Sequence, residues 1–160
     1  MTLIIEDGSI VPSANSYVTV AEISAYAVLR GFSITSDTAK IETAAILAMD
    51  YMQSKSYIGD LVDGFNSDNG EQPLKWPRQN ITDLLKTTIP TDIKSAQIEL
   101  SIASFTQSLI AASVPVSITS ESVGPLKTDY AGIGLRTSFS SARVNMLLSK
   151  YISTYGPIRV

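Results

Sequence analysis

The carboxylates best placed to do chemistry are concentrated in one short segment, residues 60–71. Its acidic members are Asp60, Asp63, Asp68 and Glu71. A calcium-binding loop needs acidic or asparagine ligands at alternate positions before an invariant glycine, with a glutamate further on. Counting back from Gly64 puts Gly59 at the first ligand position, and neither that register nor the one built on Gly70 starts with an acidic residue. We therefore interpret the segment as a solvated loop of turn-forming residues.

The same carboxylates could in principle serve a hydrolase that works with a pair of acidic groups. No rigid element is predicted to hold two of them across a cleft. The sequence has no cysteine and no histidine, so it lacks a thiolate nucleophile and the usual general base near neutral pH. Gly132 and Gly134 lack the third glycine of a nucleotide fingerprint. We predict that the chain is not an enzyme and uses no cofactor and no metal.

A second set of residues with chemical potential is cationic. Four basic residues follow Asp129, the last acidic residue: Arg136, Arg143, Lys150 and Arg159. Seven-residue spacing would place Arg143 and Lys150 on one stripe of a final helix, away from its apolar face. A solvated helix face is one interpretation. The other is a basic stripe that faces phosphates or an acidic partner, on a protein whose net charge is −3.

The only tryptophan lies in the segment Leu74-Lys75-Trp76-Pro77-Arg78. Trp76, Pro77 and Arg78 are predicted to form a structural anchor that pins a long loop to the core, with Pro77 fixing an extended exit. The alternative is an exposed contact with a partner, because tryptophan and arginine are enriched at the centres of interfaces.

The elements that must position these groups are predicted to be mainly helical. With 160 residues and 44% hydrophobic content, the chain suits one domain, which we expect to be a small bundle of about four helices. The expected parts are an extended N-terminal arm (1–18), a helical core (19–113) with a long central loop (57–90), a β-hairpin (114–136), and a C-terminal helix and tail (140–160).

Capping and turn residues define these parts. Thr19 with Glu22 forms a predicted capping box at the first helix, and Gly31 is placed to end it. The second helix is expected from residue 36 or 37 to about 55, and the third from about 92 to 113. Gly124-Pro125 would turn the hairpin, and the fourth helix would start at Ser140 and stop at Gly156-Pro157.

Several short motifs occur in the order found in one known family. The matching stretches are Glu6-Asp7-Gly8, Val11-Pro12, residues 14–22, Leu74-Lys75-Trp76-Pro77-Arg78, Ile89-Pro90, Ile93-Lys94 with Ala96, Glu99-Leu100, Val123-Gly124-Pro125-Leu126-Lys127 and Tyr130-Ala131. Together they resemble the head-to-tail connector (adaptor, or head completion) proteins of tailed bacteriophages. Some members of that family carry the label of a DnaT-like single-stranded-DNA-binding protein. The serine- and threonine-rich third helix and hairpin depart from the family pattern, which leaves the lateral contacts open.

The resemblance implies a structural virion protein. Such a protein would form a homo-oligomer, a dodecameric ring, that docks on the portal protein and links the capsid to the tail or the next neck protein. Double-stranded DNA would pass through its channel, and Arg136, Arg143, Lys150 and Arg159 would face the portal or the DNA. The implied location is the virion neck, after synthesis in the host cytoplasm.

The alternative function is that of a single-stranded-DNA-binding replication accessory protein. Such proteins usually combine a basic groove with several stacking aromatic residues. A pI near 4.8 and a single tryptophan argue against that interpretation. No membrane partner is expected, because no apolar stretch approaches the roughly 20 residues of a membrane span. The first residues also lack the basic start of a signal peptide.

Overall fold

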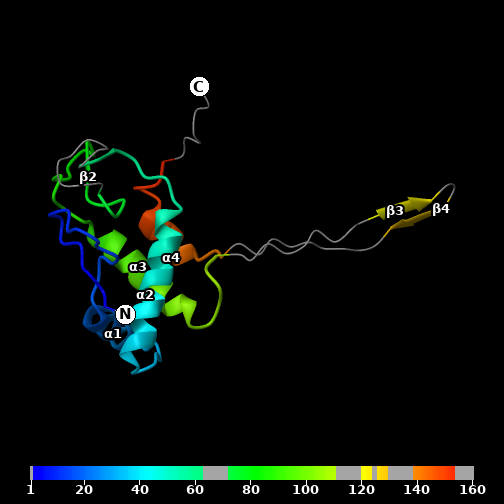
Figure 1. Ribbon diagram of the computed structural model, residues 1–160, viewed down its shortest axis with the longest axis horizontal. Helices are drawn as coiled ribbons and strands as arrows, with labels where there is room; N and C mark the ends of the chain where they lie inside the picture. Colours follow the sequence, from blue (N-terminus) through cyan, green and yellow to red (C-terminus); the bar gives the residue numbers. More distant parts are fainter. Residues whose placement is uncertain (1, 63–71, 111–119, 124–125, 130–138, 154–160) are drawn as a thin grey trace. The chain divides into compact units, whose positions relative to one another are not determined.

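The computed structural model describes residues 2–62, 72–110, 120–123, 126–129 and 139–153 (Figure 1). Within these ranges the chain forms four helices and two small antiparallel sheets of two strands each. The prediction of a mainly helical small domain is therefore confirmed. The chain divides into two units, one made of residues 1–109 and 140–160 and the other of residues 110–139.

Helix α1 (Val20–Leu29) starts and ends where local chemistry dictates. The Thr19 side chain accepts a hydrogen bond from the Glu22 backbone, and the Glu22 carboxylate accepts one from the Thr19 backbone, so the predicted capping box is confirmed. At the other end Gly31 has a φ of 71°, and the Phe32 N–H donates to the Ala27 carbonyl at 2.9 Å. This closed turn ends the helix at the predicted glycine and fixes the backbone of Phe32.

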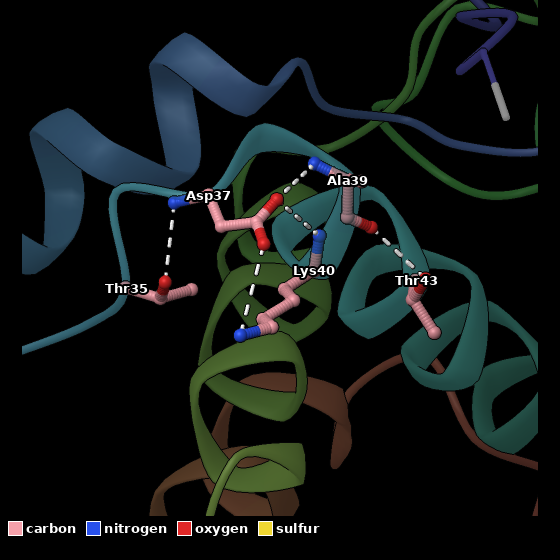
Figure 2. A network of polar contacts seen from close by, with 5 residues as sticks. All are labelled: Thr35, Asp37, Ala39, Lys40 and Thr43. Atoms are coloured by element: carbon pink, nitrogen blue, oxygen red, sulfur yellow. Dashed lines mark hydrogen bonds and ion pairs between the residues drawn. The ribbon is translucent and has the colours of Figure 1, made fainter.

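Helix α2 (Thr38–Gln53) begins at a second side-chain cap. Asp37 Oδ1 accepts hydrogen bonds from the backbone N–H groups of Ala39 at 3.0 Å and Lys40 at 3.4 Å (Figure 2). The buried residues of this helix follow helical spacing and are Ile41, Ala44, Ala45, Ala48, Met49, Tyr51 and Met52. The predicted helix from residue 36 or 37 to about 55 is confirmed to within about two residues at either end.

Helix α3 (Thr91–Ser104) packs against α1, α2 and α4, so it is the central helix of its unit (Figure 1). It ends before the predicted residue 113. The hydroxyls of Ser104 and Thr106 donate to the carbonyls of Ser101 and Ala103, at 2.7 and 3.1 Å. Hydroxyl groups that bind nearby carbonyls in this way compete with the helical backbone bonds and favour a turn.

Helix α4 (Ala142–Leu148) is also shorter than predicted. Beyond Leu148 the chain turns, and Ile152 forms an antiparallel bridge with Tyr57. The Ile58 N–H donates to the Tyr151 carbonyl at 2.9 Å, and the Ser153 N–H donates to the Ser56 carbonyl at 3.0 Å. Pairing with residues 56–58 replaces the last turns of the expected helix. The predicted stop at residues 156–157 lies outside the described residues.

The predicted extended arm is a compact loop in the structure. The Glu6 side chain is fully buried, and its two carboxylate oxygens accept hydrogen bonds from the backbone N–H groups of Gly8, Ile10 and Val11 at 2.8–2.9 Å. Ile5 and Ser16 form a bridge that brings the two ends of the loop together. The expectation of an extended arm was wrong because a buried carboxylate gathers these amides around itself.

The predicted central surface loop is partly core. Strand β1 (Asp60–Leu61) pairs with strand β2 (Arg78–Gln79), and the intervening residues 63–71 lie outside the described ranges. Leu74, Trp76 and Pro77 are buried, as are Ile89 and Pro90 at the end of the segment. Its apolar residues therefore contribute to the core, while polar positions such as Asp60 and Asn80 stay exposed.

The second unit contains the predicted β-hairpin. Strand β3 (Ser120–Val123) pairs antiparallel with strand β4 (Leu126–Asp129), from Ser120 opposite Asp129 to Val123 opposite Leu126. The hairpin is confirmed for these eight positions, and the rest of the predicted range 114–136 is not described.

Of the helices in the described ranges, none has the length and apolarity needed to cross a membrane.

Candidate nucleic-acid interface

Trp76 lies in the protein interior and is inaccessible to a partner. Its side chain is 0% exposed, and the rings of Tyr57 and Tyr151 meet it edge-on, with centroid distances of 5.9 and 5.4 Å. The Trp76 backbone N–H also donates to the Tyr17 hydroxyl at 3.1 Å. This burial does not fit the alternative of an exposed contact with a partner, and the role of Trp76 as an anchor stays a prediction.

Arg78 is likewise committed to the protein itself. Its guanidinium donates to the backbone carbonyls of Ile58 at 2.7 Å, Gly59 at 2.5 Å and Lys75 at 3.2 Å. Burial lowers the pKa of Arg78 from its ordinary value, and Asp60 partly offsets this effect. A guanidinium with this many internal acceptors has few donors left for a ligand, so Arg78 belongs to the anchor.

The predicted basic stripe is mostly neutralised by carboxylates of α3. Arg143 Nε lies 2.6 Å from Glu99 Oε1, and Lys150 Nζ forms an ion pair with Asp92. Hydrogen bonds with Asp92 and Tyr151 raise the pKa of Lys150. Lys150 lies beyond the end of α4, so it shares no helical stripe with Arg143. Arg136 and Arg159, the other two predicted residues, lie outside the described ranges.

A cluster that the sequence did not reveal surrounds Tyr26. The Arg30 guanidinium lies over the Tyr26 ring, 3.5 Å from its centroid, and the Tyr26 hydroxyl donates to Glu99 Oε1 at 2.6 Å. Arg143 completes the group by donating from a terminal nitrogen to the Tyr26 hydroxyl at 3.3 Å. We call Tyr26, Arg30, Glu99 and Arg143 the tyrosine–arginine cluster. It joins α1, α3 and α4, whose residues lie far apart in the sequence.

The electrostatics of the cluster leave one positive charge in excess, from two guanidinium groups and one carboxylate. Burial is the main cause that raises the pKa of Tyr26, followed by its hydrogen bond to Glu99, so the hydroxyl stays protonated and donates. Arg143 is 48% exposed at its side chain. Arg30 is exposed, and in the described part of the chain its side chain has only the ring contact. The cluster thus offers free N–H donors at the surface.

Exposed apolar and aromatic groups border this cluster along the chain. Val28 is 78% exposed and Leu29 82% exposed at the end of α1, and Phe32 is 39% exposed just after it. The closed turn at Gly31 holds Phe32 near the helix end. An exposed ring two residues from an unpaired arginine offers a flat surface and a cation together, the two features that nucleotide-binding proteins use for bases and phosphates.

Comparison with known families decides the classification. The family model described as "Putative DnaT-like ssDNA binding protein" matches residues 1–160. The chain belongs to this DnaT-like family. No curated protein and no solved structure matches it.

Membership of the DnaT-like family corrects the prediction of a virion connector. The family label that the resemblance included is confirmed, whereas the matched description names binding of single-stranded DNA and no virion, portal or neck component. The expected identity as a head-to-tail connector was therefore wrong. No finding supports the ring, portal or tail partners that followed from it, and the cellular location stays a prediction.

Part of the cluster could have been found from the sequence. Tyr26 and Arg30 are four positions apart in a segment predicted to be helical, a spacing that places both on one face. Glu99 gave no such signal, because its separation from Tyr26 is 73 positions and its approach depends on helix packing. The acidic segment 60–71 is mostly outside the described residues, and no group of three possible metal ligands occurs within the described ones.

Proposed function

We propose that this DnaT-like chain binds single-stranded DNA as a replication accessory protein. The observation that carries the proposal is the family match, which extends over all 160 residues. Binding, in place of catalysis, also suits a sequence without cysteine or histidine. The tyrosine–arginine cluster and the exposed Phe32 add the two kinds of group that such binding uses.

The acidic character of the chain limits the strength of this binding. The net charge is −3, and several cations of the described residues are already paired or hydrogen-bonded inside the protein. The protein can therefore neutralise few DNA phosphates at once. If it neutralises two phosphates, raising the salt concentration from 50 to 200 mM weakens binding by about sevenfold, because the salt exponent for single strands is about 0.7 per phosphate.

Fluorescence anisotropy with the full chain tests the proposal. A labelled oligothymidine is titrated at both salt concentrations, and a duplex of the same length is titrated in parallel. We expect saturable binding, a preference for the single strand, and a shallow dependence on salt. Dissociation constants weaker than about 10⁻⁴ M for the single strand, which is the weak limit of non-specific binding, would overturn it. Stronger binding to the duplex would overturn the choice of single-stranded substrate.

A further inference from the structure

We infer that the tyrosine–arginine cluster is the phosphate-binding contact for this DNA, with Phe32 as the surface on which a base stacks. The inference rests on the proposed function for the identity of the ligand. Its physical content is that Arg30 and Arg143 hold one backbone phosphate between them. Nothing in the family description assigns residues to this role.

The first step of the argument is that one ring positions both cations. Arg30 lies over the face of Tyr26, and Arg143 donates to the hydroxyl of the same residue. The same residue thus contacts both guanidinium groups, one over the face of its ring and the other at its hydroxyl, and it is only 9% exposed. A planar guanidinium with several fixed N–H donors matches the geometry of a phosphate better than a flexible ammonium does.

The second step is that Glu99 orients Arg143 without using all of its donors. Glu99 Oε1 pairs with Nε of Arg143 and accepts a hydrogen bond from the Tyr26 hydroxyl, both at 2.6 Å. One terminal nitrogen of Arg143 faces Tyr26, and the remaining donors lie on a side chain that is 48% exposed. Glu99 is 9% exposed, so a phosphate would approach from the side of the arginines and not from that of the carboxylate.

The third step compares other cations in the described ranges. Lys75 Nζ donates to the Lys55 carbonyl at 2.6 Å, Lys150 pairs with Asp92, and Lys40 lies 3.7 Å from Asp37. Each of these is engaged by a neighbouring backbone or carboxylate oxygen. Within the described ranges Arg30 lies over a neutral ring, as Lys55 does over Tyr51, so binding a phosphate at Arg30 breaks no existing ion pair.

The fourth step concerns Phe32. The turn closed by the Phe32 N–H and the Ala27 carbonyl sets the backbone of this residue at the end of α1, just after Arg30. Phe32 is 39% exposed, although phenylalanine is one of the residues most often buried. Stacking of a base on such a ring tolerates any sequence, as expected of a protein that binds single strands generally.

The experiment compares Arg30→Ala with Lys86→Ala in the anisotropy titration. Both changes remove one exposed positive charge, but Lys86 lies in the loop before α3, away from the cluster in the sequence. We expect Arg30→Ala to weaken binding by about tenfold, since it removes a charge-assisted phosphate contact, and Lys86→Ala by less than about twofold. Phe32→Leu, which keeps an apolar side chain, should weaken binding by about fivefold. Unchanged thermal melting of each variant confirms that it is folded.

The outcomes separate the two proposals. If the wild-type chain binds the oligonucleotide and Arg30→Ala binds as Lys86→Ala does, the inference is overturned and the proposed function stands. If the wild-type chain does not bind it, the proposed function fails. The arginine Nε–H resonances are then followed by NMR during titration with inorganic pyrophosphate. Shifts confined to Arg30 and Arg143 would support a phosphate site without DNA, and their absence would overturn the inference as well.

Discussion

The hydroxyl of Tyr26 donates a 2.6 Å hydrogen bond to Glu99 Oε1, across 73 positions of sequence. The same oxygen lies 2.6 Å from Nε of Arg143. One carboxylate of α3 therefore receives a donor from α1 and a cation from α4. Because this one oxygen contacts residues of two other helices, it couples the positions of α1 and α4. A substitution at Glu99 should therefore affect both helices.

Glu99→Gln should lower the free energy of unfolding by about 1 kcal/mol. The amide keeps one acceptor oxygen but loses the charge that strengthens both bonds, and the exposure of Arg143 reduces the effect through solvent screening. Urea denaturation measures it. Asp37→Asn is the matched control, because asparagine is as good an N-cap as aspartate and the pair with Lys40 is exposed (Figure 2). Equal stability losses in the two variants would contradict the role of Glu99.

Trp76→Ala should destabilise the protein by about 3–5 kcal/mol, because a fully buried indole leaves a large cavity between Tyr57 and Tyr151. Thermal melting followed by circular dichroism measures the loss. Phe32→Ala, at a residue that is 39% exposed, provides the control and should have a much smaller effect. A melting temperature that does not change in Trp76→Ala would show that the anchor is not needed.

Glu6→Gln should loosen the N-terminal loop and cost about 1–3 kcal/mol. The buried carboxylate accepts three backbone N–H groups, and an amide can offer only one oxygen to them. Hydrogen exchange of the amides of Gly8, Ile10 and Val11 should speed up. Asp7→Asn serves as the comparison, since Asp7 is exposed and its carboxylate accepts hydrogen bonds from the backbone N–H and the hydroxyl of Ser9. Protection of the three amides that survives in Glu6→Gln would refute the prediction.

Stability should fall at alkaline pH through two buried tyrosines. Burial raises the pKa of Tyr17 and of Tyr57 well above the ordinary tyrosine value of about 10. Above pH 10 the unfolded chain therefore loses protons that the folded chain keeps. The stability that these two tyrosines contribute is fully present below pH 10 and is lost as the pH rises further. Urea denaturation between pH 8 and 11 checks this.

The Tyr57→Phe variant tests the source of that pH dependence. Phenylalanine removes one titrating group and also the hydroxyl bond to the Met52 carbonyl, so stability at pH 8 should drop while its decline above pH 10 becomes shallower. An identical decline in the variant and the wild-type chain would assign the effect to other groups.

Helices α1 and α2 were predictable because their signals are local. Thr19 with Glu22 and the Asp37 cap lie within one turn of the helices that they begin, and Gly31 lies just past the end of α1. The ends of α3 and α4 were not, because hydroxyl groups and pairing with residues 56–58 decide where these helices stop. Hydrophobic spacing alone does not predict where such contacts replace the helical hydrogen bonds and end a helix.

The loop around Glu6 and the tyrosine–arginine cluster depended on contacts that no sequence window contains. A glutamate next to Asp7 and Gly8 suggests a solvated turn, yet its carboxylate is fully buried among backbone amides. Arg143 was singled out for its charge, but its partners lie on α1 and α3. Sequence identified the cation, and tertiary packing decided what it touches.

The division of the chain into two units has a consequence for how this protein can change. Residues 110–139 form one unit, and the residues before and after them in the sequence, 1–109 and 140–160, together form the other. In the sequence the hairpin segment lies between α3 and α4, and these two helices pack directly on each other. A shorter or longer segment at this place is therefore expected to leave the packing among the four helices intact.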